Sequence, residues 1–171
     1  PYTMLQAYNV SVPPEFIVKN STPGFISWQV DKVQPLERLN AAAKVVSYTS
    51  LAAALGGDNV TEVGLKLALK RPGGASELVN ATADPQLAGL DVYQFEFSCD
   101  TLHELVLYAL VTRGSERILC NVAVRTPQPL WIERKEFFET ILASFAPLEP
   151  QAPVARAPAP APAPATEAES S

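Results

Sequence analysis

The chain has 171 residues and a mass of 18.4 kDa, which is enough for one domain and a short appendage. Its 47% hydrophobic and 18% charged residues are typical of a globular protein and exclude a disordered or collagen-like chain over most of the length. A net charge of −5 argues against nucleic acid as the main partner, no apolar run is long enough for a membrane span, and two cysteines cannot build a disulfide scaffold.

The first half of the chain predicts several short strands and one helix. We expect strands at Tyr8–Val12, Phe25–Val30, Lys44–Thr49 and around Leu78–Ala81, and a helix near Val60–Lys70. Asn59 is a suitable N-cap for that helix, and Pro72-Gly-Gly74 is expected to end it. Two further stretches, Asn40–Ala43 and Leu51–Leu55, stay open between strand and helix.

Residues 91–125 give the clearest pattern of the chain. Val92–Phe97 alternates apolar and polar residues and predicts a half-buried strand. Leu105–Val111 is apolar throughout and predicts a central strand covered on both faces. Ile118–Val124 follows after Gly114-Ser115, which suits a two-residue hairpin with positive φ at the glycine. These three strands predict an antiparallel meander.

The two turns of this meander also fix a register. They place Cys120 beside Ala109, and Ala109 beside Val92. Cys99 then lies about 20 Å away along its strand, at ~3.3 Å per residue. Because a disulfide needs Cα atoms within about 7 Å, we expect Cys99 and Cys120 to stay unpaired.

A helix closes the domain and a proline-rich tail follows it. Phe138, Ile141, Leu142 and Phe145 form an apolar stripe at helical spacing, with Trp131 at the start and Pro147 as the stop. We expect one domain over residues 1–148. Residues 149–171 contain Ala-Pro repeats that favour extended polyproline II, so we interpret them as a solvated tail or tether.

Few residues of the chain suggest catalysis or metal binding. His103 is the single histidine and no Gly-x-Ser-x-Gly motif accompanies it, so a hydrolase triad is not expected. One histidine and two distant cysteines cannot form a zinc site, which leaves His103 as a weak candidate metal ligand. Trp131 is a weak candidate for an exposed docking aromatic, with packing at the sheet as the alternative.

Four Asn-x-Ser/Thr sequences begin at Asn9, Asn20, Asn59 and Asn80. In a secreted protein they could carry glycans, although the tripeptide is also common by chance.

Over residues 8–146 the sequence resembles the PsbP family of extrinsic photosystem proteins. The resemblance rests on Gly89-Leu-Asp-Val-Tyr-Gln-Phe-Glu-Phe97, His103-Glu-Leu-Val-Leu-Tyr-Ala-Leu-Val111, Gly114-Ser-Glu-Arg-Ile-Leu-Cys120, Trp131, Ser144-Phe145 and, more loosely, Tyr8-Asn-Val-Ser-Val-Pro13. It implies an α+β fold, an α/β/α sandwich whose central antiparallel sheet is covered by helices on both faces.

The resemblance also implies a function. It points to a non-enzymatic extrinsic protein of the chloroplast thylakoid lumen that docks on a photosystem core and other lumenal subunits. The partner that the resemblance favours is photosystem II, with its oxygen-evolving complex and the associated calcium and chloride ions. A PsbP-domain assembly factor for a photosystem or an NADH dehydrogenase-like complex is the alternative, and a secreted glycosylated binding domain is the second alternative. No tightly bound cofactor is implied.

Two departures from the family pattern bear on ion retention. Fewer than ten residues precede the first predicted strand, whereas the photosystem II subunit has a longer N-terminal arm. Gln128 and Pro129 occupy the region where that subunit has an acidic residue linked with the central-strand histidine to metal binding. Direct calcium or chloride retention is therefore not expected, and only His103 carries over.

Overall fold

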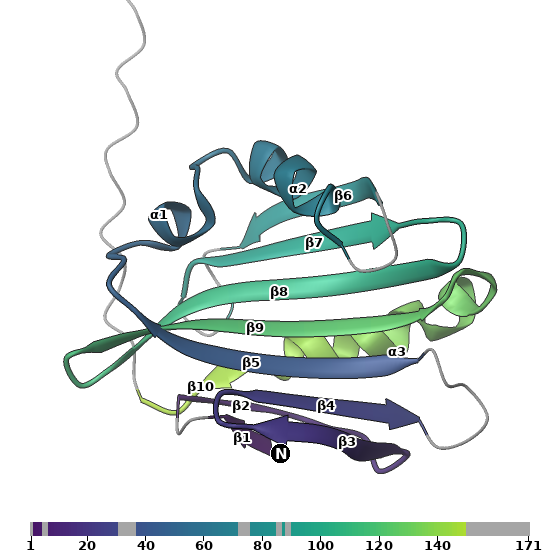
Figure 1. The fold of residues 1–171 in the computed structure, drawn as a ribbon, viewed down its shortest axis with the longest axis horizontal. Helices are drawn as coiled ribbons and strands as arrows, with labels where there is room; N and C mark the ends of the chain where they lie inside the picture. Colours follow the sequence, from purple (N-terminus) through teal and green to yellow (C-terminus); the bar gives the residue numbers. More distant parts are fainter. Residues whose placement is uncertain are drawn as a thin grey trace, which may run out of the picture.

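A wide antiparallel sheet organises the chain in the computed structural model, which describes residues 2–4, 7–30, 37–71, 76–84, 87 and 90–149 (Figure 1). Seven strands follow the order β3-β4-β5-β9-β8-β7-β6, and a smaller sheet has the order β1-β2-β10. The strands are β1 (Tyr2–Met4), β2 (Tyr8–Val10), β3 (Phe16–Thr22), β4 (Phe25–Val30), β5 (Arg38–Val46), β6 (Glu77–Asp84), β7 (Val92–Ser98), β8 (Leu102–Arg113), β9 (Glu116–Pro127) and β10 (Ala146–Pro147). The helices are α1 (Leu51–Leu55), α2 (Val60–Ala68) and α3 (Trp131–Ala143).

The predicted meander of β7, β8 and β9 is confirmed together with its register. Val92 lies opposite Ala109, and Ala109 lies opposite Cys120. Gly114 turns the β8–β9 hairpin with a φ of +57°, a conformation that glycine adopts without a steric penalty. Both cysteines are free, as the register predicts.

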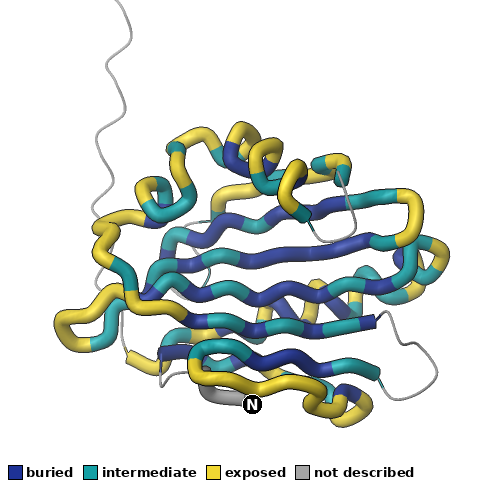
Figure 2. Tube along the Cα trace, in the orientation of Figure 1, coloured by how far each residue is buried: buried dark blue, intermediate teal, exposed yellow. Residues whose placement is uncertain are grey.

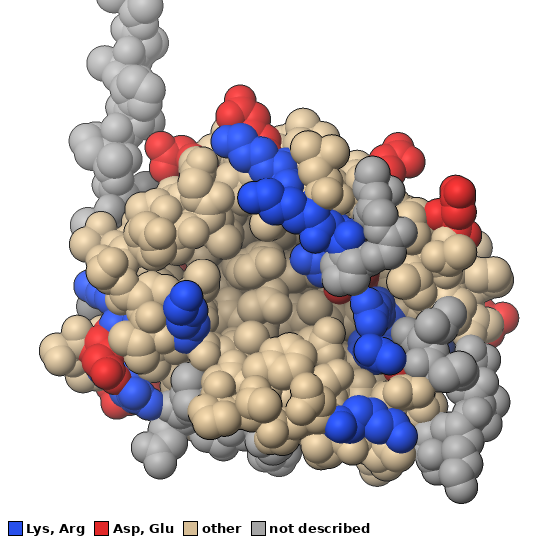
Figure 3. All heavy atoms as spheres, in the orientation of Figure 1, with Lys and Arg blue, Asp and Glu red and all other residues tan. Residues whose placement is uncertain are grey.

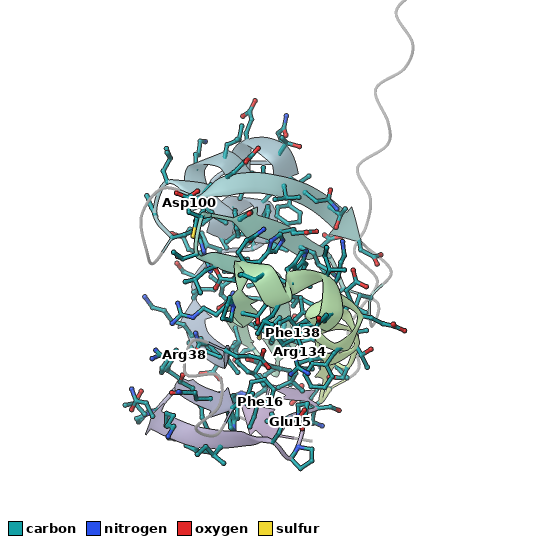
Figure 4. All side chains as sticks on the ribbon, turned by 90° about the vertical axis from the view of Figure 1, so that its right-hand side faces the viewer. Glu15, Phe16, Arg38, Asp100, Arg134 and Phe138 are labelled. Carbon is teal, nitrogen blue, oxygen red and sulfur yellow. The ribbon has the colours of Figure 1, made fainter. Side chains whose placement is uncertain are left out.

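Helices cover the sheet on both faces, which confirms the predicted α+β sandwich (Figures 1 and 4). Helix α3 packs against β8 and β9 on one face, here called the α3 face. Its core contains Val10, Trp28, Leu39, Val92, Leu107, Val122, Phe138, Ile141, Leu142 and Phe145. Helices α1 and α2 cover a separate cluster on the other face, made of Leu51, Val63, Ala68, Tyr93, Phe95, Phe97, Val106 and Ala123.

A buried ion pair fixes α3 against the start of β5. Glu37 is only 2% exposed and pairs with Arg134 of α3, while the Thr126 hydroxyl donates to its Oε2 at 3.0 Å. The Arg134 guanidinium also lies 4.1 Å from the centroid of the Phe137 ring. Because Arg134 and Thr126 both satisfy this carboxylate, its burial is compensated and the helix has one defined position.

Helices α1 and α2 cover only part of the opposite face. Asn59 caps α2 as predicted, and Gly64 brings the helix so close to β6 that an added Cβ would lie 2.8 Å from a methyl of Leu78. α2 packs on β6 and β7, and α1 on β8. No helix of the described chain lies over this face of β9, β5 and β4, which is called the open face below (Figures 1 and 2).

Several boundaries differ from the sequence-based prediction. β5 begins at Arg38, six residues before the predicted strand, because Leu39, Ala41 and Ala43 alternate into the core of the α3 face. Of the two stretches left undecided between strand and helix, Asn40–Ala43 is therefore strand, whereas Leu51–Leu55 is a helix capped by Ser50. β3 was not predicted, since this edge strand is almost entirely exposed and has no apolar alternation. The predicted helix stop at Pro72-Gly-Gly74 and the tail beyond Glu149 lie outside the described residues.

The two thiols should react very differently with an alkylating reagent. A hydrogen bond from the Thr101 backbone lowers the pKa of Cys99, which is partly exposed, whereas burial raises the pKa of Cys120, which is fully buried. We expect iodoacetamide to modify Cys99 in the folded chain, with a rate that rises at lower pH than for free cysteine, and Cys120 only after unfolding. A Cys99→Ser variant is the control. Equal labelling of both thiols, or a recovered Cys99–Cys120 disulfide, would contradict the register.

Candidate functional site

The structure places His103 in a closed polar cluster at the start of α3. Its ring is 4% exposed, with Nε2 at 2.8 Å from Glu96 Oε1 and Nδ1 at 3.0 Å from Gln128 Oε1. The Ser98 hydroxyl also donates to Gln128 Oε1, at 3.2 Å. We call Glu96, Ser98, His103 and Gln128, together with Trp131 and Lys135, the histidine cluster.

Both hydrogen-bond partners of the His103 ring are oxygen acceptors. Nε2 contacts the Glu96 carboxylate and Nδ1 the Gln128 side-chain amide, so both ring nitrogens already have hydrogen-bond partners. Among the described residues, no three His, Cys, Asp or Glu side chains gather where they could hold a metal ion. His103 and Glu96 are the pair that could contribute an imidazole and a carboxylate, if Gln128 moved away. His103 as a metal ligand stays a prediction.

Trp131 is not an exposed docking aromatic. It is 7% exposed, and its ring stacks on His103 at a centroid distance of 3.8 Å and an interplanar angle of 10°. The indole packs over the histidine cluster from the first turn of α3, and docking through Trp131 stays a prediction. The next residue, Ile132, is 90% exposed and is the apolar side chain that α3 offers to solvent.

Lys135 links the cluster to the surface. Its Nζ lies 3.5 Å from Glu96 Oε2 and 5.8 Å from the centroid of the Trp131 ring. Glu96 thus contacts His103 through Oε1 and Lys135 through Oε2, which compensates its burial. Glu96 is not among the site residues predicted from the sequence. Alternation along β7 nevertheless puts it on the same face as Ser98, and Ser98 lies directly opposite His103.

The open face holds a second group of polar residues, none of which is predicted from the sequence as a site residue. Figure 3 shows this side of the molecule hollowed, with no Lys, Arg, Asp or Glu at the centre of the hollow and Lys and Arg side chains around it. Arg38 of β5 lies opposite Arg125 of β9, and Arg125 lies opposite Glu104 of β8. Arg71, just after α2, completes the line with a salt bridge of 2.5 Å to Glu104. We call Arg38, Arg125, Glu104 and Arg71 the arginine row.

The arginine row contains three positive groups and only one carboxylate, so its charge is not fully neutralised. Glu104 is bound to Arg71, and no carboxylate of the described chain forms a salt bridge with Arg38 or Arg125. Burial lowers the pKa of Arg125, Glu104 opposes that shift, and the neighbouring Arg38 and Arg71 add to it. The buried Nε of Arg125 and the buried Oδ1 of Asn40, which neighbours it on the open face, have no hydrogen-bond partner.

Comparisons with solved structures identify similar folds. The chain is similar to cyanobacterial PsbP (CyanoP) from Synechocystis sp. PCC 6803, with a TM-score of 0.63 and 22% identity over 85% of this chain and 90% of that one. It is also similar to LpqN of Mycobacterium tuberculosis, described as involved in cell envelope biogenesis, with a TM-score of 0.57 and 10% identity over 82% of both chains. The comparison with the Saccharomyces cerevisiae Ran-binding protein Mog1p gives a TM-score of 0.48 and 10% sequence identity, over 84% of this chain and 91% of that one.

No protein-family model and no curated protein matches the chain. The structural similarity shows that the chain has a PsbP-like fold. The sequence identities are too low to show more than the fold. No helix of the described residues has the length and apolarity needed to cross a membrane.

Replacing Glu96 should destabilise the fold far more than replacing an exposed glutamate of α3. Glu96→Ala leaves the buried His103 ring without its carboxylate, so we expect the free energy of unfolding to fall by about 3 kcal/mol. Glu139→Ala is the matched control, since Glu139 also contacts Lys135 but is exposed, and it should cost under ~0.5 kcal/mol. Urea denaturation compares the two. Equal losses would show that the histidine cluster does not stabilise the start of α3.

Proposed function

We propose that this chain is a PsbP-domain protein of the chloroplast thylakoid lumen that docks on a photosystem complex without catalysing a reaction. Photosystem II, with the protein supporting its oxygen-evolving complex, is the first choice for the partner. In this role the protein is peripheral to the membrane and binds the photosystem core and other lumenal subunits. It does not include direct retention of calcium or chloride.

The observation that carries the proposal is the convergence of the residues behind the sequence resemblance. His103 and Trp131 are far apart in the sequence, yet their rings stack at 3.8 Å in the histidine cluster. Gln128 occupies the region where the family resemblance implies an acidic partner for this histidine, and it does contact the ring. The motifs thus belong to one packed unit, and the fold likeness to cyanobacterial PsbP agrees with them.

We propose a binding role without catalysis because of the chemistry of the histidine cluster and of the arginine row. His103, the one histidine, has both ring nitrogens engaged and its ring buried under Trp131. The arginine row offers positive charge and hydrogen-bond donors, which suit binding of an anionic group. A binding protein uses such groups directly, whereas an enzyme would need a positioned nucleophile or base beside them.

An assembly factor with the same fold is the second candidate for this lumenal role. It would associate with photosystem or NADH dehydrogenase-like intermediates only transiently, whereas a subunit would be present in stoichiometric amounts in the purified complex. A secreted glycosylated domain is a third candidate. Against it, the Asn59 side chain caps α2 by accepting hydrogen bonds from the backbone of Thr61 and Glu62, and Asn9 lies in the middle strand of the small sheet.

Native-gel fractionation of thylakoid complexes tests the proposal. We expect this chain to migrate with a photosystem and to be released from lumen-exposed membranes by a wash in ~1 M salt, because the Debye length shrinks to about 3 Å. Such release follows if the contacts are between charged groups at the surface.

The exposed Ile132 provides the opposing outcome for this experiment. If an apolar contact through α3 held the protein, it would resist salt, and Ile132→Ser would weaken its retention. Retention through the salt wash would contradict electrostatic docking. Absence from every thylakoid complex, in both steady-state and assembling membranes, would contradict the proposed function itself.

A further inference from the structure

We propose that the open face binds an acidic segment of a partner protein, with an Asp or Glu carboxylate of that segment seated between Arg38 and Arg125. This inference rests on the proposed docking function and names the chemistry of the partner. It assigns the arginine row as the recognition element on the open face, opposite the α3 face that carries the histidine cluster.

The row is placed for binding by the register of three paired strands. Arg38, Arg125 and Glu104 occupy facing positions on β5, β9 and β8, so their side chains project from the same face of the sheet. The α3 face is on the other side, where Leu39, Val124 and Leu105 enter the core. Figure 4, which views the sheet from its side, shows Arg38 across the sheet from Arg134 and Phe138 of α3.

The charge of the row calls for an anionic partner. Like charges in facing positions destabilise a sheet, and Arg38 faces Arg125 with no carboxylate of the described chain in salt-bridge contact with either. Glu104 is already bound through Arg71, which donates from Nε at 2.9 Å. A carboxylate placed between Arg38 and Arg125 would neutralise the pair.

A second unsatisfied atom favours a peptide over a simple anion. Asn40 lies two residues from Arg38 on the same strand and face, and its buried Oδ1 has no donor. A fully ionised phosphate or carboxylate brings only acceptors, whereas a peptide segment brings backbone N–H donors beside its acidic side chain. Both atoms are closed to solvent in the unbound structure, so a bound segment satisfies them only when the Asn40 and Arg125 side chains turn outward.

The floor beside the row suits an extended segment. Ala42, Leu119 and Leu110 project from β5, β9 and β8 on the same face and are partly exposed, and the centre of the hollow carries no Lys, Arg, Asp or Glu (Figure 3). Lys66 of α2 and Lys70 just after it are exposed and add positive charge on the α2 side of the sheet. Alternating acidic and apolar residues would match this combination of a basic edge and an apolar floor.

Fluorescence anisotropy with a labelled, N-acetylated octaglutamate peptide tests the proposal on the full-length chain. We expect binding at low ionic strength that Arg38→Gln/Arg125→Gln weakens by at least about tenfold. The matched control is Arg113→Gln/Arg117→Gln, which removes the same charge from the β8–β9 hairpin end, where both arginines already have partners. This control should change the affinity by less than about threefold. Octalysine should not bind.

Further variants separate the acidic-segment site from general charge attraction, from a simple anion site and from occupation by the chain's own tail. Urea unfolding checks that the glutamine variants fold, and Arg38→Lys/Arg125→Lys, which keeps the charge, should retain binding weaker than wild type but stronger than the glutamine pair. Equal losses in both glutamine pairs would overturn the proposal in favour of general charge attraction. Displacement by inorganic phosphate at the same total charge would overturn it in favour of an anion site. Tighter peptide binding after deletion of residues 150–171 would indicate that the tail, with Glu167 and Glu169, occupies the face.

This experiment separates the two proposals. Peptide binding by a chain that is absent from thylakoid complexes would overturn the lumenal function and leave the acidic-segment site standing. Migration with a photosystem by a chain that binds no octaglutamate would overturn the site alone.

Discussion

The way in which three helices cover a seven-stranded sheet determines the rest of the structure. Helix α3 and the small sheet close the α3 face, where the apolar core is continuous from Trp28 to Leu107. On the opposite face, α2 lies over β6 and β7, and α1 reaches β8. A strand that is covered on both faces is apolar throughout, as β8 is in its centre, whereas β9 and β5 carry polar residues on the side without a helix.

The two faces use buried charge in different ways. On the α3 face each buried carboxylate is satisfied: Glu37 by Thr126 and Arg134, and Glu96 by His103 and Lys135. Such groups fix the position of α3 and contribute to one defined fold. On the open face, Arg125 and Asn40 retain buried atoms without partners. Unsatisfied groups cost free energy of folding, so their presence is better accounted for by a bound partner than by stability.

Much of the fold could be predicted because the meander obeys local rules. The continuous apolar run of β8, the glycine turn at Gly114 and the alternation of β7 each depend on residues close in sequence. β5 was placed too late because its N-terminal half is rich in alanine, which favours strands only when packed against a core such as that formed by Leu39 and Ala41. β3 has no core-facing alternation to detect.

The two polar groups were harder to predict, for different reasons. Glu96 could have been found, since the predicted register puts Ser98 opposite His103 and alternation brings Glu96 to the same face. The arginine row could not, because it needs the pairing of β5 with β9, and these strands are far apart in the sequence. Trp131 was offered as a docking residue because its sequence position gives no sign that His103 covers its ring.

The central claim is that Arg125 is kept for binding at a cost to stability, and one measurement tests it directly. Burial and the neighbouring arginines disfavour the charge of Arg125, and Met retains the apolar volume of its stem. Urea denaturation of Arg125→Met, with no peptide added, should give a free energy of unfolding equal to the wild type or higher by up to about 1 kcal/mol. A clear loss of stability would show that the folded chain itself satisfies this arginine, and would contradict the claim.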